Sequence, residues 1–372
     1  MLLGNYVCGD VFKVTPSGTF TSLYSFNHSG DGQIPVARLV QASDEDLFGT
    51  TLEGGANFND PCGVFGCGTV FKITTKGTLT TLYSFCSQSN CADGFSPYAG
   101  LVQATNGDLY GTTSAGGANG DGTVFKITTK GTLTTLYSFC SQSSCADGSS
   151  PYAGLVQATN GDLYGTTSAG GGDGDGTVFK ITPKGTLTTL YSFCSRSNCA
   201  DGSSPYAGLI QATNGDLYGT ASAGGANGDG TVFKITPKGT LTTLYSFCSQ
   251  SNCADGSSPY SGLIQDTNGT FYGATYEGGA NGGGTVFSLS VGLGPFVETN
   301  PTSGKVGAVV KILGTDLTGA TSVTFNGTAA KFKVVSKSEV KTTVPEGATT
   351  GTVEVTTPNG TLKSNVVFRV RR

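Results

Sequence analysis

Residues 97–139 read PYAGLVQATNGDLYGTTSAGGANGDGTVFKITTKGTLTTLYSF, and this stretch decides the fold. It contains four short runs rich in β-branched and aromatic residues, at 100–104, 109–113, 123–128 and 133–139. Asn106-Gly107 separates the first two runs and is a strong hairpin signal. The third and fourth are joined by the turn 129–132, and a glycine-rich loop, 114–122, connects the second to the third. The pattern predicts a four-stranded antiparallel meander.

The same pattern recurs along most of the chain. The tripeptide Val-Phe-Lys begins at Val11, Val70, Val124, Val178 and Val232, and Val-Phe-Ser follows at Val286. The spacings are 59 residues once and then 54 residues four times. Residues 70–123 and 124–177 differ at only four positions. A repeat of about 50 residues that cannot bury both faces of its sheet alone is typical of propeller blades.

The number of strands predicts the number of blades. Four whole units run over 35–85, 97–139, 151–193 and 205–247. A C-terminal half, 259–289, supplies three further strands, and an N-terminal half, 11–26, supplies two. We therefore expect an all-β, five-bladed β-propeller over residues 1–292, closed by pairing of the two halves, with one strand to spare.

Composition excludes several functional classes. Of 372 residues, 59 are Gly, only 12% are charged, and the net charge is −4. The chain therefore has no basic footprint for nucleic acid and no apolar run long enough to insert into a membrane. Residues 1–10, MLLGNYVCGD, lack the basic and apolar regions of a signal peptide.

The eleven cysteines indicate the cellular compartment in which the protein works. Apart from Cys8 they form C-x4-C pairs, which suit local disulfides better than a metal site because no His stands near them. Disulfides favour an oxidising, extracellular location, which is in tension with the lack of a signal-peptide pattern. The predicted pairs are Cys62/Cys67, Cys86/Cys91, Cys140/Cys145, Cys194/Cys199 and Cys248/Cys253.

The string SPYAGLVQATNGDLYGTTSAGGANGDGTVFKIT (96–128) resembles the Gloeobacter/Verrucomicrobia (GloVer) tandem repeat of secreted bacterial proteins. The resemblance covers residues 11–290 and implies an exported protein with a propeller-like fold. It implies no activity and no catalytic residues. The unit is also similar in layout to NHL-type blades.

A second pattern begins after residue 292. Its segments, including NPTSG (300–304), VTFNG (323–327) and GTVEV (351–355), are short alternating strands separated by turn signals. Such spacing predicts an immunoglobulin-like β-sandwich over residues 293–372. The order of the segments is similar to IPT/TIG domains, which resemble spacer and adhesion modules.

Candidate binding residues recur in each copy on the predicted face of long loops. In a meander the tight turns share one end of the strands, and the glycine-rich and cysteine loops share the other. A carboxylate beside an aromatic ring suits a sugar ligand, whereas an ordinary Asp-Gly turn and a tyrosine packed between blades are the structural alternative. The candidates are Asp93, Asp147, Asp201 and Asp255, with Tyr98, Tyr152, Tyr206 and Tyr260.

Metal and catalytic sites have less support in the sequence. Asp121, Asp175 and Asp229 in the glycine-rich loops are candidate calcium ligands, but glycine-rich turns also explain that composition. No other cofactor is expected. The single His28 has no nucleophile motif around it, and a glycosidase needs two unlike carboxylates at one site. The asymmetric positions from which a hydrolytic centre would draw are Asp44, Glu45, Glu53, Asp266, Glu277 and the insertion 57–67.

The sequence thus predicts a secreted or surface-exposed bacterial protein that is not an enzyme. Nearly equal copies favour multivalent binding of an extracellular polysaccharide or cell-surface component through the loop face. A structural or self-assembling surface protein is the alternative, and a glycan-active hydrolase is the third possibility. The sequence leaves the oligomeric state open.

Overall fold

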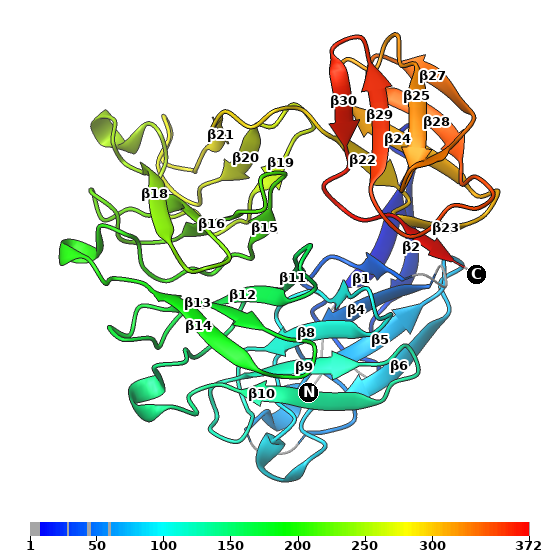
Figure 1. Cartoon of the computed structure of the whole chain (residues 1–372). Coiled ribbons are helices and arrows are strands. Elements are labelled where there is room, and N and C mark those ends of the chain that lie inside the picture. The colour runs from blue at the N-terminus through cyan, green and yellow to red at the C-terminus, as the bar shows by residue number, and fades with distance from the viewer. Residues whose placement is uncertain (1–7, 28–29, 43–45, 59–60, 372) are drawn as a thin grey trace.

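The computed structural model describes residues 8–27, 30–42, 46–58 and 61–371, and these form an almost entirely β structure. Figure 1 shows the repeats as an arc of small sheets with a separate C-terminal lobe. The helices in the described residues are single 3-10 turns, and none is long and apolar enough to be a membrane-span candidate. They are η1 (Gly63–Phe65), η2 (Ser89–Cys91), η3 (Ser143–Cys145), η4 (Ser197–Cys199) and η5 (Ser251–Cys253).

Four complete blades have the predicted meander order, in which each strand pairs antiparallel with the next. The first blade is β3 (Val40–Gln41), β4 (Leu47–Thr51), β5 (Thr69–Ile73) and β6 (Leu79–Ser84). The second is β7 (Val102–Gln103), β8 (Leu109–Thr113), β9 (Thr123–Ile127) and β10 (Leu133–Ser138). The third is β11 (Val156–Gln157), β12 (Leu163–Thr167), β13 (Thr177–Ile181) and β14 (Leu187–Ser192). The fourth is β15 (Ile210–Gln211), β16 (Leu217–Ala221), β17 (Thr231–Ile235) and β18 (Leu241–Ser246).

Aromatic residues at fixed repeat positions hold neighbouring blades together. Phe139, which follows the last strand of the second blade, meets Phe179 of the third blade edge-on, with ring centroids 5.2 Å apart. The same contact joins the other blade pairs, and both rings are fully buried. A strand glycine makes room for this ring: a Cβ at Gly165 would lie 2.6 Å from Cζ of Phe179. The Gly in each Leu-Tyr-Gly-Thr strand is therefore required by packing.

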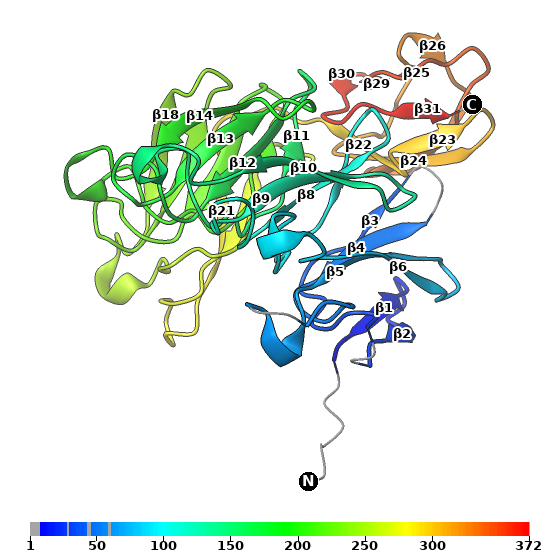
Figure 2. The same ribbon diagram turned by 90° about the horizontal axis from the view of Figure 1, so that it is seen from below.

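The two ends of the repeat region form partial blades. The N-terminal half is a hairpin of β1 (Asp10–Val14) and β2 (Phe20–Ser25), and the C-terminal half is a sheet of β19 (Ile264–Gln265), β20 (Phe271–Ala274) and β21 (Val286–Leu289). The predicted pairing between the halves is wrong, because these are separate sheets in the described chain. Figure 2 shows the hairpin beside β4–β6 and away from β21. Each half is anchored to its neighbouring blade, the hairpin through Phe26 and Phe71 and β21 through Phe247 and Phe287.

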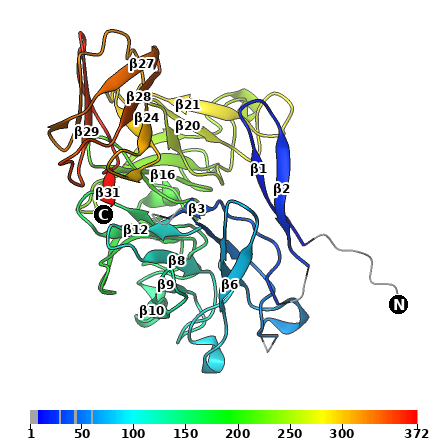
Figure 3. The same cartoon turned by 90° about the vertical axis from the view of Figure 1, so that its right-hand side faces the viewer.

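The C-terminal lobe is the predicted immunoglobulin-like sandwich, seen beside the repeats in Figure 3. Its core contains Val310, Ile312, Phe325 and Val355, all nearly inaccessible to solvent. One sheet orders its strands as β22 (Val297–Asn300), β24 (Val309–Gly314), β28 (Glu339–Thr343) and β27 (Phe332–Ser336). The other orders them as β26 (Thr328–Ala329), β25 (Ser322–Phe325), β29 (Val353–Thr357) and β30 (Gly360–Lys363), and β23 (Ser303–Lys305) pairs parallel with β31 (Arg369–Arg371).

Candidate functional site

The cysteine loops form the periphery of one face of the repeats. All five predicted cysteine pairs are disulfide-bonded, whereas Cys8 is buried and forms no disulfide. In Figure 1 the short coils of these loops lie along the left and lower edges, away from the immunoglobulin-like domain. Four of these loops precede the segments that lead into the inner strands β7, β11, β15 and β19, whereas the loop of Cys62 and Cys67 connects β4 to β5.

The aspartates of the cysteine loops are structural. Asp147 is fully buried, and its Oδ2 accepts hydrogen bonds from the Tyr137 hydroxyl (2.7 Å) and from the Ser141 N–H and hydroxyl (both 2.9 Å). Its Oδ1 accepts the N–H of Gln142 at 3.1 Å. Asp93 and Asp201 are equally buried, and the same set of bonds recurs in all four loops. We therefore correct the prediction that Asp93, Asp147, Asp201 and Asp255 face a ligand, because their carboxylates are already satisfied by their own loops.

The pKa values of Asp147, Asp201 and Asp255 reflect this bonding. Burial alone would raise the pKa of Asp255, but the hydrogen bonds from Tyr245 and Ser249 outweigh it and hold that pKa at about 2. The pKa values of Asp147 and Asp201 are lowered by the same balance. A carboxylate that accepts several N–H and O–H groups stays ionised.

The tyrosines that follow these loops form a continuous row. Tyr98 and Tyr152 have ring centroids 5.5 Å apart, as do Tyr152 and Tyr206, and Tyr206 and Tyr260 are 5.2 Å apart. Tyr98 and Tyr260, at the two ends, are 45% and 49% exposed, whereas the middle two are partly buried. The structure therefore brings the four predicted tyrosines together, whereas the hydrogen bonds of the four aspartates go to other residues. We call these four residues the tyrosine rim.

Two residues of the tyrosine rim, Tyr98 and Tyr152, line a central channel of about 720 Å³. The channel walls are the segments that lead into the five inner strands, β3, β7, β11, β15 and β19, so every blade contributes. The walls are mainly backbone and small or aliphatic side chains, including Gly100, Gly154, Gly208 and Gly262. A mostly apolar, concave space with a few polar groups is the usual form of a small-molecule site.

The immunoglobulin-like domain docks on the tight-turn face, opposite the cysteine loops. Arg369 donates to the backbone oxygen of Gln103 at 2.6 Å, and the hydroxyls of Thr267 and Thr315 lie 3.0 Å apart. Both contacts lie beside the tight hairpin turns of blades. The docked domain therefore leaves the face with the tyrosine rim uncovered.

Docking of this domain places Glu298 of β22 in the channel lining, together with Gln265 and Arg38. Desolvation, and to a smaller extent the charge of Asp266, raises the pKa of Glu298 above its ordinary value. Sequence analysis missed both charged residues. Arg38 could have been found, because it stands where the other copies have Gly100, Gly154, Gly208 and Gly262. Glu298 gave no such signal, because it belongs to the other domain.

The calcium candidates do not form an oxygen-rich cluster. Asp121, Asp175 and Asp229 each lie within 4.8 Å of two cysteine sulfurs, and those sulfurs belong to disulfides. In the described chain no second carboxylate joins any of these groups. Calcium binds six to eight oxygens, so these sets do not fit it.

The asymmetric carboxylates among the described residues do not converge on one centre. Asp44, Glu45 and His28 lie outside the described residues, as do two positions of the insertion 57–67. Glu53 accepts a hydrogen bond from Gln33 at 3.0 Å, and the backbone of Glu277 pairs with that of Ser257. Of the three single positions that the structure describes, Glu53, Asp266 and Glu277, it is Asp266 whose charge adds to desolvation in raising the pKa of Glu298.

Sequence comparison identifies the family. The model of the Gloeobacter/Verrucomicrobia repeat matches residues 2–200 and 194–321. The chain belongs to this repeat family. An IPT/TIG domain model matches residues 296–370 of the same repeat protein, in agreement with the sandwich described above. A comparison with curated protein sequences found no match.

Solved structures similar to the repeat protein have low sequence identity. A luciferin-regenerating enzyme is 10% identical with a TM-score of 0.47, and the alignment covers 77% of this chain and 85% of that one. A glucose dehydrogenase is 12% identical with a TM-score of 0.45, covering 77% and 92%. The endo-arabinase of Bacteroides thetaiotaomicron is 15% identical with a TM-score of 0.35, covering 69% and 94%. We assign none of the activities of these proteins to this chain.

Proposed function

We propose that the repeat protein is a non-catalytic, extracellular carbohydrate-binding protein that takes a polysaccharide segment at the tyrosine rim. The observation that carries this proposal is the row of four adjoining tyrosines, two of which, Tyr98 and Tyr152, line the central channel. Tyrosine offers a flat apolar face to a sugar ring and a hydroxyl that bonds to sugar oxygens. A row of rings can contact several consecutive sugar units.

Two further observations support this site. The immunoglobulin-like domain is docked on the opposite face, so the rim is accessible to a long polymer. The five disulfides are consistent with an extracellular location, where such polymers occur. The low net charge of −4 suits a neutral ligand better than a strongly charged one.

Substitution of the rim tests the proposal. The intact protein is screened against an array of bacterial and plant polysaccharides, beside one variant with all four rim tyrosines changed to Ala and a matched variant with the same four changed to Phe. Each stacked ring contributes about 1 kcal/mol, so the Ala variant should bind at least tenfold more weakly. The Phe variant keeps the apolar faces and should retain most of the binding. If the wild type binds a polysaccharide and the folded Ala variant binds it equally well, the tyrosine rim is not the binding site. If the wild type binds no polysaccharide, the proposed function is wrong.

A hydrolytic role is the second candidate, because Glu298 lines the channel and its pKa is raised. A protonated carboxylic acid can donate to the leaving oxygen of a glycosidic bond, and Asp266 is the nearest candidate for the second carboxylate. Under this reading Glu298→Gln should lower release of reducing ends from a bound polysaccharide at least a hundredfold while binding persists. The hydrolytic candidate would be eliminated if the wild type released no detectable reducing ends, or if the Glu298→Gln variant released them as fast as the wild type.

A further inference from the structure

The fifth blade lacks the fourth strand that every complete blade has. In the complete blades the third strand pairs with a fourth strand that begins with Leu, whereas β21 is the last strand of its sheet. Val286 of β21 is consequently 83% exposed, although its equivalents Val70, Val124 and Val178 are fully buried. An unpaired edge of this kind readily accepts another strand.

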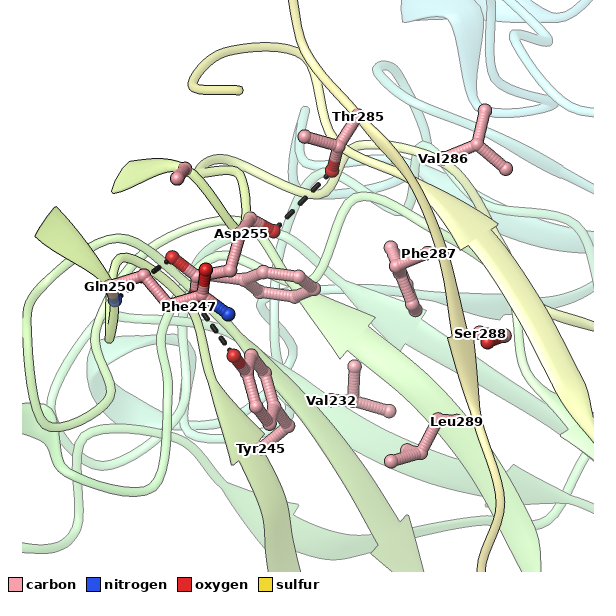
Figure 4. Close-up of a pocket in the computed structure, with 11 residues that line it drawn as sticks. Val232, Tyr245, Phe247, Gln250, Asp255, Thr285, Val286, Phe287, Ser288 and Leu289 are labelled. Carbon is pink, nitrogen blue, oxygen red and sulfur yellow. Dashed lines mark hydrogen bonds between the residues drawn. The ribbon is translucent and has the colours of Figure 1, made fainter. Parts of the chain in front are cut away.

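A pocket of about 340 Å³ lies beside this open edge. Figure 4 shows Phe287 and Leu289 of β21 on one side of the pocket and Val232 and Tyr245 of the fourth blade on the other. In the preceding blade junction the equivalent residues pack around Leu241, the first residue of the fourth strand. The pocket thus marks the place of an apolar side chain that the fifth blade does not supply.

The N-terminal hairpin has the complementary defect. In complete blades the third strand is flanked on both sides, but β1 pairs only with β2 and leaves its other edge unpaired in the described chain. Phe12 and Phe20 stack on each other with centroids 5.1 Å apart, yet they are 55% and 60% exposed. Val14, opposite Phe20 in the register, is 55% exposed. The hairpin therefore presents an apolar face next to an open strand edge.

The two defects are held apart within one chain. The hairpin packs on the first complete blade through Val11 and Phe26, which cluster with Phe71 and Ile73. The β21 sheet is held by Phe287 against the fourth blade, and Phe296, after β21, bonds through its N–H to Thr267. The two halves therefore pack on different blades of the same chain.

We propose that the repeat protein associates head to tail, with the β1–β2 hairpin of one copy docked on β21 of the next. The open edge of β1 pairs with the open edge of β21, and the face that carries Phe12 and Phe20 covers the apolar side of the pocket, formed by Val232, Phe287 and Leu289. Each copy then has one donor hairpin and one acceptor edge, so the contact is heterologous and builds chains or rings. Such assemblies would place many channels along one polymer, which raises avidity.

A mixing experiment tests this contact. The donor-deficient variant carries Phe12→Lys and Phe20→Lys, and the acceptor-deficient variant carries Val286→Lys; all three residues are exposed, so both variants should fold. Sedimentation velocity of the wild type should show association that increases with concentration, and each variant alone should be monomeric. An equimolar mixture should form heterodimers and nothing larger, because it contains one intact donor and one intact acceptor. The matched control is Val335→Lys, at an exposed site in the immunoglobulin-like domain, and it should associate like the wild type.

Three results of this experiment would contradict the head-to-tail contact. A wild type that stays monomeric at all concentrations would overturn the proposal, including the case in which the hairpin closes onto β21 of its own chain. Association that persists in either single variant would place the contact elsewhere, and failure of the mixture to form heterodimers would exclude a head-to-tail contact. Because the assay contains no carbohydrate, its result is independent of the proposed binding function.

Discussion

Changing Asp201 to Ala is expected to lower the free energy of unfolding by about 3 kcal/mol. The fully buried carboxylate accepts the Tyr191 hydroxyl at 2.7 Å, the Ser195 hydroxyl at 2.9 Å and the Ser195 N–H at 3.0 Å. Alanine would leave these donors without their acceptor inside the cysteine loop. Equilibrium unfolding in guanidinium chloride measures the change. Asp216→Ala in the same repeat is the matched control: its carboxylate makes a partly exposed ion pair with Lys234 at 3.6 Å and accepts an exposed hydrogen bond from the Asn214 side chain at 3.2 Å, so we expect a loss below about 1 kcal/mol.

Asp147, Asp201 and Asp255 should make the stability of the protein depend on pH. Their pKa values are lower in the folded protein than the ordinary value of 3.8, and that of Asp255 is about 2. Their contribution is therefore complete above the unfolded pKa and is lost as the pH falls through the folded one. The melting temperature should fall between pH 4 and pH 2, and Asp201→Asn should make that fall smaller. An Asp201→Ala variant as stable as Asp216→Ala would contradict the structural role.

Changing Phe179 to Ala is expected to cost about 4 kcal/mol of unfolding free energy, the largest effect of a single core substitution. Phe179 is fully buried, meets Phe139 across the blade junction and fills the space left by Gly165. The truncation would open a cavity between two blades that the surrounding rigid strands cannot fill. Thermal and chemical unfolding measure the loss.

The control for Phe179 is Phe65→Ala, because Phe65 is 58% exposed in the insertion. We expect this control to change the free energy of unfolding by less than about 1 kcal/mol. If Phe179→Ala and Phe65→Ala lowered the free energy of unfolding equally, contacts between blades would not dominate stability.

Sequence reasoning predicted the blades because the local signals agree with the repeat. Asn106-Gly107 sets the hairpin, and the alternation from Leu133 to Phe139 sets the outer strand. Whether the two partial blades pair with each other was not predictable from the sequence. β1 and β21 carry the same Val-Phe motif, and this motif does not specify the partner of either strand's unpaired edge. That choice depends on contacts such as Phe26 with Phe71, which are distant in the sequence.

The candidate site was predicted only in part. The recurrence of Tyr98 and its equivalents after a Pro placed the rings at the inner strands, where they form the rim. Sequence alone could not distinguish an exposed Asp-Gly turn from a buried acceptor, because Asp147 is satisfied by Tyr137 ten residues earlier and by the loop backbone. Glu298 reaches the channel only because a second domain docks there.

Hydroxyl-radical footprinting of the complex locates bound polysaccharide on the protein surface and so tests its placement on the tyrosine rim. The protein is oxidised with and without a polysaccharide identified in the array screen, and modification of each aromatic residue is measured by mass spectrometry. We predict protection of Tyr98 and Tyr260, the exposed ends of the rim, and unchanged oxidation of the exposed Phe65. Saturating polysaccharide that leaves Tyr98 and Tyr260 as reactive as in the free protein would contradict the account.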